Sequence, residues 1–486
     1  MNTEKKPIIK ELTIEKFSQK GKAIAFDEKK NKIIITNAVL KDVILAKLNK
    51  RKRKGVIKGE IVEILKPSEY RDEPKCIHFD ICGGCTWQNI KYFYQLEQKQ
   101  NFLIDAFQDF IKNTNVEIFP IVKSKNIFEY RNKMEFSFSQ NRKKTKFLGL
   151  IMKGGRFVID VQRCYLANEW FSEVLNQIKN WWEIHDFDAF NYFNGEGFLK
   201  NLTIKEGKNT QDKMVILTTS DSYTLSDIEI KDFIDHIIKA IYPSKKISIF
   251  LNTQISKKGI KTTFNLQKLY GEDNIQEDLN IDALGEKIKL KFKIGPNSFF
   301  QPNTDMAQYL YSTAINYLKK EEIKNKIALD LYSGTGTIGM ILSRFVKKVI
   351  AIELSENACQ MAKDNMKLNN IKNFEMINGD VSKILNTLLS DKNFEKPEIV
   401  IVDPPRSGLG DEAIENILKI SPEIIIYISC NINTQLEDIK ILTNLDLINP
   451  DWTNKKYQLK ILHPIDQFPH TFHIENIAIL KKLDFD

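Results

Sequence analysis

The stretch Glu398–Thr434, EIVIVDPPRSGLGDEAIENILKISPEIIIYISCNINT, decides the fold of the C-terminal part of the chain. It contains two apolar runs rich in β-branched residues, Glu398–Val402 and Ile424–Ile428, and each run stops abruptly at polar residues. The 18 residues between Arg406 and Ile425 are enough for a helical crossover, so the pattern predicts two parallel strands in one sheet. The stretch is therefore typical of a strand–helix–strand unit in an α/β fold.

Polar side chains follow both strands of this unit. Asp403 comes directly after the first run, and Cys430 closes the second. Parallel neighbours would bring both residues to the carboxyl edge of the sheet, where α/β sheets bind their ligands. A carboxylate and a thiol at one such edge indicate chemistry.

A glycine-rich turn lies upstream, in the segment Ile327–Gly339. Gly334, Gly336 and Gly339 form a GxGxxG motif between a predicted strand and a predicted helix, which lets a nucleoside-bearing ligand approach the backbone closely. The next strand ends at Glu353, 19 residues after Gly334, where a carboxylate can accept both ribose hydroxyls. The motif by itself is compatible with NAD as well as with S-adenosylmethionine.

Strand and helix patterns alternate from Lys291 onward and predict a doubly wound, Rossmann-like α/β domain. Ahead of the glycine turn, a helix is expected over Thr304–Leu318. Five predicted strands end one after another at or near polar residues, namely Asp330, Glu353, Asp380, Asp403 and Cys430. Functional side chains repeated at strand ends are what such a sheet needs to build one site.

The composition is that of a soluble protein with real cores. The 486 residues, of which 42% are hydrophobic and 28% charged, predict two to four domains. No apolar run reaches the length that spans a bilayer, and the first residues lack the apolar stretch of a signal peptide. We therefore expect a cytoplasmic protein without a membrane partner.

Positive charge is concentrated at the N-terminus. Residues 1–75 contain 20 Lys or Arg against 11 Asp or Glu, in a chain whose net charge is +9. A basic N-terminal segment in a chain that is otherwise nearly neutral predicts a docking surface for a polyanion such as RNA. A generally lysine-rich, solvated surface is the alternative explanation.

The basic N-terminal segment, residues 8–66, reads as short strands separated by charged turns, which predicts a small β-barrel. Its run NKRKRK, Asn49–Lys54, fits a basic loop between two strands, and barrels of the OB type bind RNA through such loops. The segment resembles a TRAM domain. The expected strands are Leu12–Ile14, Lys22–Phe26, Lys32–Thr36, Val43–Leu48 and Gly59–Leu65.

Cysteines form a second motif. In a cytosolic chain they are not expected to form structural disulfides. Three of them are arranged as Cys-x5-Cys-Gly-Gly-Cys, and a distant fourth can complete a set of four thiolates around one centre; they are Cys76, Cys82, Cys85 and Cys164. Such a set suits Zn²⁺ or an iron–sulfur cluster, and ordinary buried thiols are the alternative.

The central region offers weaker signals. A helix is expected over Trp87–Ile111. In Glu129–Ser139 basic and aromatic residues alternate, so Arg131 and Lys133 can contact phosphates while nearby rings stack on bases, each stack contributing roughly 1–3 kcal/mol. A strand with one solvated and one buried face explains the same pattern, and Lys200 does not stand out from the basic background.

The chain closes with the segment Ile465–Glu475, IDQFPHTFHIE, followed by an apolar strand. A loop that folds back over the carboxyl edge would place Glu475 beside Asp403 and Cys430. A surface carboxylate is the alternative for Glu475, and a core histidine is the alternative for His473.

Together these motifs resemble the RNA uracil-C5-methyltransferases, particularly the bacterial 23S ribosomal RNA enzymes with a TRAM domain and an iron–sulfur cluster. Two motifs are highly specific and fit without departure: DPPRSG followed by IIYISCNINT, within Asp403–Thr434, and IDQFPHTFHIE, Ile465–Glu475. The resemblance covers nearly the whole chain. It implies a TRAM-like basic β-barrel over residues 1–67, a central α+β RNA-binding domain with the cysteines over 68–290, and a class I methyltransferase domain over 291–486.

The resemblance also implies roles for individual residues. The donor would be S-adenosylmethionine, and its site would be lined by Gln301, Tyr332, Gly334, Gly336, Glu353 and Asp403. The metal group would be a [4Fe-4S] cluster rather than zinc, held by Cys76, Cys82, Cys85 and Cys164. Cys430 would be the nucleophile, Glu475 the general base, and Phe299 a platform for the target uracil. The expected partner is RNA, with 23S ribosomal RNA favoured over transfer RNA, and the expected oligomeric state is a monomer.

The chemistry explains these residue types. Uracil C5 is a poor nucleophile, but a thiolate that adds at C6 creates an enolate whose C5 can attack the sulfonium methyl. A base must then remove the C5 proton so that the thiol can leave. Free cysteine has a pKa of about 8.5, so the site must favour the thiolate, and Arg406 can help electrostatically. A target base in folded RNA must also be flipped out of its stack.

Other functions fit fewer of these residues. RNA cytosine-C5-methyltransferases typically carry Pro-Cys after the aspartate strand, and amino-group methyltransferases an aromatic residue after Pro-Pro, whereas this chain has Pro404-Pro405-Arg406. An iron–sulfur RNA-binding protein without activity would not need Cys430 and Glu475. An NAD dehydrogenase matches only the glycine turn.

Overall fold

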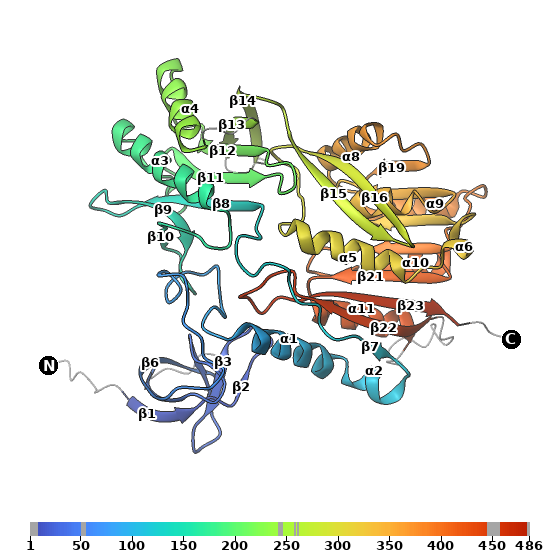
Figure 1. Ribbon diagram of the computed structural model, residues 1–486, viewed down its shortest axis with the longest axis horizontal. Helices are drawn as coiled ribbons and strands as arrows, with labels where there is room; N and C mark the ends of the chain where they lie inside the picture. Colours follow the sequence, from blue (N-terminus) through green and yellow to red (C-terminus); the bar gives the residue numbers. More distant parts are fainter. Residues whose placement is uncertain are drawn as a thin grey trace.

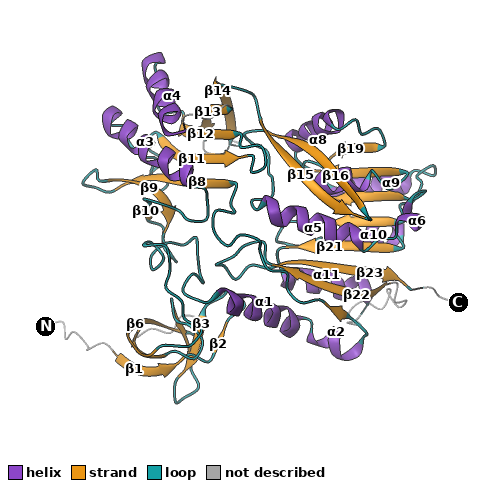
Figure 2. Ribbon diagram, viewed as in Figure 1, coloured by secondary structure: helices purple, strands orange, loops and turns teal. Residues whose placement is uncertain are grey.

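The computed structural model describes residues 8–49, 55–241, 246–256, 259, 262–444 and 457–483. Within these residues the chain forms four β-sheets, of six, seven, two and eight strands, with helices packed on and between them (Figure 1). The N-terminal sheet lies apart from the large C-terminal sheet, and long loops fill the region between them and the central sheet (Figure 2). The mixed α/β architecture confirms the predicted fold class.

The eight-stranded C-terminal sheet has the order β19-β18-β17-β20-β21-β23-β22-β7. Its first five strands are parallel, as their alternation with helices predicts. β23 is antiparallel and lies between β21 and β22, while the short β7 joins the far edge from a distant part of the chain. The strands are β7 Glu117–Ile118, β17 Ile327–Leu331, β18 Lys348–Glu353, β19 Phe374–Asn378, β20 Ile399–Val402, β21 Ile424–Ser429, β22 Tyr457–Ile465 and β23 Glu475–Lys482.

Both faces of this sheet are buried, which explains its continuous apolar strands. Leu329 and Ile425 face a core shared with α9, α10 and α11, whereas their neighbours Ala328 and Ile426 face a core shared with α5, α7 and α8. The helices are α5 Thr304–Asn316, α6 Lys320–Ile323, α7 Thr337–Leu342, α8 Glu356–Leu368, α9 Val381–Ser390, α10 Asp411–Ile420 and α11 Ile432–Thr443. The predicted helix Thr304–Leu318 thus corresponds to α5.

The N-terminal sheet has the order β1-β5-β6-β4-β3-β2, with only the β4–β6 pair parallel. Its strands are β1 Ile8–Thr13, β2 Lys16–Phe17, β3 Ala23–Phe26, β4 Lys32–Ile35, β5 Val43–Leu48 and β6 Ile57–Lys66. Each predicted strand overlaps an observed one, but β1 begins at Ile8 rather than at the predicted Leu12, and β2 is additional. Of the predicted basic loop Asn49–Lys54, only Asn49 lies within the described residues.

The central part is built on a seven-stranded sheet, order β10-β9-β8-β11-β12-β13-β14, with α3 and α4 on one face (Figure 1). A two-stranded hairpin, β15–β16, follows and packs in one core with α5. The elements are β8 Lys133–Gln140, β9 Lys146–Ile151, β10 Val158–Asp160, α3 Glu169–His185, β11 Leu199–Glu206, β12 Lys213–Ser220, α4 Asp227–Ile241, β13 Ile247–Ile255, β14 Thr263–Tyr270, β15 Ile275–Ala283 and β16 Glu286–Ile294.

The helix predicted over Trp87–Ile111 differs in its boundaries. It begins at Tyr92 and is divided at Phe107 into α1 Tyr92–Ala106 and α2 Gln108–Asn113. Trp87 is excluded because Lys91 N–H, which would bond to the Trp87 carbonyl in a helix, donates to the distant Tyr70 carbonyl at 2.9 Å instead. α1 shares one core with the N-terminal and C-terminal sheets, so the boundaries near 67 and 290 stay predictions.

No helix in the described ranges combines the length and the apolar character needed to cross a membrane.

Candidate active site and cysteine cavity

Cys430 and Glu475 meet at the carboxyl edge of the C-terminal sheet. β21 ends at Ser429, which is paired with Asn476 of the antiparallel β23. Cys430 follows Ser429 directly and Glu475 precedes Asn476, and the charge of Glu475 acts on the Cys430 thiol. The sequence predicts that a loop folding back over the edge brings Glu475 close to Cys430. In the structure the two residues lie at the same edge because β23 starts there beside β21.

Glu475 lies in a strongly acidic and buried environment. Only 3% of the residue is exposed. Burial and the charge of Asp403 raise the pKa of Glu475 well above its usual range, and Arg406 opposes them. Burial also raises the pKa of Asp403 to about 7. Both carboxyl groups can therefore be ionised at the same time only when a cationic ligand lies beside them. Without such a ligand, one of them keeps its proton.

The Cys430 thiol is half-buried and lines a cavity of about 250 Å³ together with Arg406 and His473. Burial and the nearby Glu475 raise the pKa of the thiol, while the charge of Arg406 and a hydrogen bond from its side chain lower it. Arg406 is held in place because its carbonyl accepts a hydrogen bond from Asn431 Nδ2 at 2.9 Å. The arginine is therefore the cation that favours a thiolate at this position.

His473 borders the same cavity, and burial lowers its pKa to about 4, with Arg406 adding to the effect. It is therefore a neutral histidine near neutral pH, in agreement with a half-buried structural residue.

The glycine turn is tied to the neighbouring strand ends. Gly334 N–H donates to Glu353 Oε2 at 3.0 Å, and both Gly334 and Gly336 have positive φ values, 57° and 75°. Tyr332 also has a positive φ of 59°, unusual for a residue with a side chain, and its hydroxyl donates to the Leu409 carbonyl at 3.0 Å. The turn, Glu353 and the loop after Asp403 thus form one edge.

Other predicted positions lie around this edge. Asp330 is buried under the turn and accepts a hydrogen bond from Gly339 N–H at 2.9 Å, which indicates a structural role. Asp380 caps α9 through Lys383 N–H. Gln301 lies just before α5, where its carbonyl accepts from Asn132 Nδ2 at 2.8 Å.

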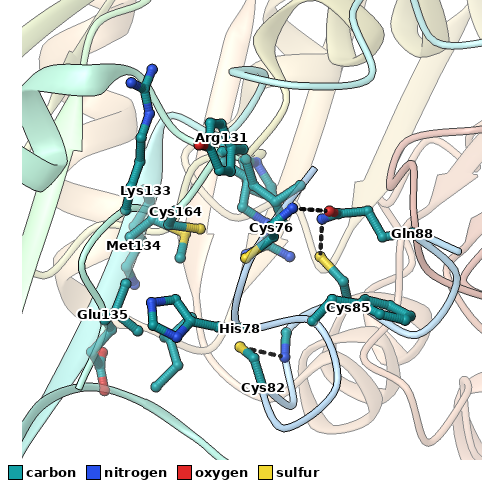
Figure 3. A pocket seen from close by; sticks show the side chains of 18 of the residues that line it. Cys76, His78, Cys82, Cys85, Gln88, Arg131, Lys133, Met134, Glu135 and Cys164 are labelled. Carbon is teal, nitrogen blue, oxygen red and sulfur yellow. Dashed lines mark hydrogen bonds between the residues drawn. The ribbon is translucent and has the colours of Figure 1, made fainter. Parts of the chain in front are cut away.

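The four cysteines of the predicted metal site line one cavity of about 370 Å³ between the central sheet and the preceding loop. Figure 3 shows their sulfur atoms around a common space, with the Gln88 amide donating to Cys85 Sγ at 3.5 Å. Gly84 N–H donates to Cys82 Sγ at 3.4 Å. The distant Cys164 thus lines the same cavity as the three close cysteines.

These thiols do not converge on a single point. Among the described side chains, no three or more His, Cys, Asp or Glu are close enough together to hold one metal ion. Burial raises the pKa of Cys85 to about 12 and that of Cys164 to about 11. Without an electrophilic centre the thiols would therefore stay protonated.

Arg131, Lys133 and Phe299 also line the cysteine cavity. Phe299 is 64% exposed, and it borders this cavity rather than the one that contains Cys430. Arg131 lies over the Phe468 ring, with 5.8 Å from Cζ to the ring centre. The basic residues predicted to contact phosphate thus flank a cavity next to the loop that leads to Glu475.

Several contacts that hold the site carry no sequence motif. Tyr311, on α5, is 5% exposed, and burial together with negative charges raises its pKa; the charges are those of Asp403, Glu475 and Asp330. An apolar helix position gives no sign of such a neighbourhood. Asp438 accepts from Leu409 N–H at 2.8 Å and Tyr427 OH at 2.5 Å, which fixes the loop after Asp403.

The loop that ends at Glu475 is anchored to the segment after Cys85. Thr86 and Trp87 both donate their backbone N–H to the His470 carbonyl, at 2.9 and 3.0 Å. Gln95 Oε1 accepts from His470 N–H at 2.9 Å. His470 has a φ of 64°, so its backbone is held in a conformation that it would rarely adopt alone.

Comparison with known proteins gives consistent matches. A family model described as tRNA (Uracil-5-)-methyltransferase matches residues 91–483. An uncharacterised RNA methyltransferase of Protochlamydia amoebophila is 39% identical and covers 88% of this chain and 96% of its own length. One of Clostridium tetani is 35% identical over 98% of each chain.

Among solved structures, Pyrococcus abyssi tRNA (uracil-54, C5)-methyltransferase in complex with S-adenosyl-L-homocysteine is similar at a TM-score of 0.72 and 25% identity. The similarity covers 97% of this chain and 99% of that chain. The family match includes Cys164, Cys430 and Glu475 and begins after Cys85.

Proposed function

The chain belongs to the RNA uracil-5-methyltransferase family, whose donor is S-adenosylmethionine, and from this premise we propose that it methylates C5 of a uridine in 23S ribosomal RNA. The observation that carries the proposed chemistry is the register between β21 and β23. Its last pair, Ser429 and Asn476, adjoins a thiol, Cys430, directly after one strand and a buried carboxyl group, Glu475, at the start of the other. Nucleophile and base are the two groups that methylation of a pyrimidine carbon requires.

We propose that the glycine-turn edge binds the donor. Gly334 and Gly336 allow close approach of the nucleoside, and Glu353 accepts hydrogen bonds from its ribose. Tyr332, Gln301 and Asp403 complete this site. The buried carboxyl groups near Asp403 favour a cation, and the donor's sulfonium is a cation.

In the proposed reaction Cys430 Sγ, favoured as thiolate by Arg406, forms a bond to C6 of the flipped-out uracil. C5 of the resulting enolate attacks the sulfonium methyl, and S-adenosylhomocysteine leaves. Glu475 then takes the C5 proton, the C6–sulfur bond breaks, and the thiolate is restored. Atoms and charges balance without any further reactant.

The cysteine motif and the basic N-terminal sheet favour ribosomal RNA, because they resemble the cluster-bearing bacterial enzymes. Transfer RNA is the second candidate, since the family model and the archaeal structure are both named for it. We infer that the N-terminal sheet is a TRAM domain and that the protein acts as a cytoplasmic monomer. The three predicted parts, 1–67, 68–290 and 291–486, belong to this proposal.

We further propose that Cys76, Cys82, Cys85 and Cys164 hold a [4Fe-4S] cluster. Support comes from the four thiols, which line one cavity. Four thiolates are a ligand set for such a cluster, with one thiolate per iron, and the resemblance to the cluster-bearing enzymes favours it over zinc. The cluster would be structural and would support the segment that Arg131 and Lys133 flank.

The proposed function is tested by mapping 5-methyluridine in 23S ribosomal RNA and in transfer RNA from a deletion strain. Loss of one ribosomal 5-methyluridine, restored by the wild-type gene and not by Cys430→Ala, is the expected result. Cys359→Ala is the matched control, because it removes a buried thiol that the reaction does not use. Loss confined to transfer RNA would select the second candidate, and full activity of Cys430→Ala would overturn the nucleophile.

A further inference from the structure

Lys200, on β11, is a buried lysine whose ammonium lacks a polar partner. Only 2% of the residue is exposed. Within the described parts of the chain it makes no hydrogen bond or ion pair, and Nζ instead lies 3.8 Å from the Phe190 ring centre and 5.9 Å from that of Tyr192. Nζ is not among the fully buried side-chain atoms without a hydrogen-bond partner, so the ammonium keeps contact with solvent and can receive an anionic ligand from outside.

The electrostatics of Lys200 also favour an anionic ligand. Burial lowers the pKa of Lys200, and the charge of Asp221 offsets only part of that effect. An external anion would stabilise the charged form, whereas the aromatic rings contribute a weaker cation–π attraction.

The backbone directs Lys200 to this place through an irregularity in its strand. The pairing of β11 with β12 passes from Leu199 opposite Thr219 to Asn201 opposite Thr218, which leaves Lys200 as an extra residue. Bulges of this kind re-aim a side chain and are over-represented next to functional sites.

Tyr192, which lies near Lys200, and two further rings beside Tyr192 and Arg156 in the chain are turned toward solvent. Phe193 is 80% exposed, Tyr192 66% and Phe157 76%. The Arg156 guanidinium lies over the Phe193 ring, with 5.7 Å from Cζ to the ring centre. Exposed ring faces combined with cations fit single-stranded nucleic acid, whose bases stack while its phosphates pair with the cations.

This aromatic–basic patch, defined as Arg156, Phe157, Tyr192, Phe193 and Lys200, adjoins the strand that leads to the cysteine cavity. Asn201, next to Lys200, is paired with Ser137 of β8. Lys133, four residues earlier on β8, lines that cavity beside Phe299. Four strand residues span roughly 13 Å, which about four stacked nucleotides at ~3.4 Å each can follow.

We propose that the aromatic–basic patch binds single-stranded RNA that flanks the target uridine, with a phosphate at Lys200 and bases stacked on Tyr192 and Phe193. The inference rests on the proposed RNA methylation and adds the place where the flanking strand is held. A protein partner is the competing occupant, and it would leave RNA affinity independent of the patch.

The test measures binding of a fluorescently labelled oligouridylate to the full chain over a range of salt concentrations. Lys200→Met keeps most of the side-chain bulk and removes the charge. It should weaken binding and make the slope of log K against log [salt] shallower by about 0.7, the value for one phosphate contact on a single strand. Lys320→Met, which removes an exposed lysine paired with Glu286, is the control and should change neither quantity.

Aromatic variants separate stacking from charge. Phe193→Ala should lower affinity about 5- to 150-fold, the range for one lost base stack, and leave the salt slope unchanged. Phe193→Leu keeps apolar bulk without a ring face and should lose nearly as much. Arg156→Ala, on an exposed turn, repeats the charge test at a second position if Lys200→Met does not fold.

Thermal unfolding and S-adenosylmethionine binding are measured on every variant to establish that the fold is intact. If Lys200→Met and Phe193→Ala fold well and bind RNA with wild-type affinity and salt slope, the proposal that the patch binds RNA is wrong. The same result is expected if a protein partner occupies the patch. Patch-dependent RNA binding by an enzyme that methylates no uridine would instead overturn the proposed function alone. The two failures are therefore distinguishable.

Discussion

The ion pair between Lys99 on α1 and Asp466 gives a sharp test of how the loop before Glu475 is held. Lys99 Nζ lies 2.5 Å from Asp466 Oδ1, and neither side chain is exposed. Lys99 also donates to the Phe468 carbonyl at 3.1 Å, and Tyr92 OH donates to the second oxygen of Asp466 at 2.7 Å. Burial lowers the pKa of Lys99, and the attraction of Asp466 opposes this shift.

Lys99→Met should therefore lower the free energy of unfolding by about 3–5 kcal/mol, because it leaves a buried carboxylate without its counter-charge. Combining it with Asp466→Asn should cost less than the sum of the two single changes, since the double variant contains no unpaired buried charge. Tyr92→Phe removes one hydrogen bond to a charged group and should cost about 1.5–3 kcal/mol. The methyl-transfer rate should fall with the first variant, since the loop carries Glu475.

Urea unfolding followed by tryptophan fluorescence measures these changes, and Trp87 packs in the same core as α1. Lys41→Met is the matched control, because Lys41 forms an exposed ion pair with Glu69 and such pairs contribute little. If Lys99→Met is no more destabilising than this control, or if the double variant is fully additive, the pair does not hold the loop in the way described.

Three further predictions concern the carboxyl edge of the C-terminal sheet and the cysteine cavity. Glu475→Gln should accumulate a covalent RNA–protein adduct on a denaturing gel, because C5 deprotonation is blocked; full product release would place the base elsewhere. Burial raises the pKa of Asp403 to about 7, so its protonated form stabilises the donor-free protein below pH 4 and this contribution is lost as the pH rises toward 7. The thermal midpoint should fall across that window, and less so in Asp403→Asn; an equal fall would show that other groups cause it. Anaerobically purified protein should be brown and contain about four irons, fewer in Cys164→Ala, whereas colourless protein with zinc would contradict the cluster.

The parallel part of the C-terminal sheet could be predicted from the sequence because its signals are local. Each strand is a short apolar run, each run ends at a polar residue, and a helix-length segment separates one run from the next. The carboxyl edge shared by Asp403 and Cys430 follows from parallel pairing alone. The position of Glu475 does not follow in this way, because it depends on β23 being inserted between β21 and β22. The sequence of a strand does not specify which other strands it pairs with.

Buried polar contacts between distant segments could not be predicted. Lys99 and Asp466 are 367 residues apart, and each looks like an ordinary surface charge in the sequence. The predicted start of α1 is wrong for the same reason, since the bond that keeps Trp87 out of the helix runs from Lys91 N–H to the carbonyl of the distant Tyr70. Lys200 is indistinguishable from other lysines until the fold covers it with aromatic rings. The missing information lies in tertiary partners, and no local pattern records them.

The same long-range contacts connect the cysteine cavity to the proposed base. Cys85 is followed directly by Thr86 and Trp87, whose N–H groups donate to the His470 carbonyl, and His470 stands five residues before Glu475. The strained φ of His470 persists only while these donors and Gln95 hold it. A group that orders the cysteine loop therefore also orders the segment that delivers Glu475 to Cys430. We therefore propose that the four cysteines position the proposed base through this segment.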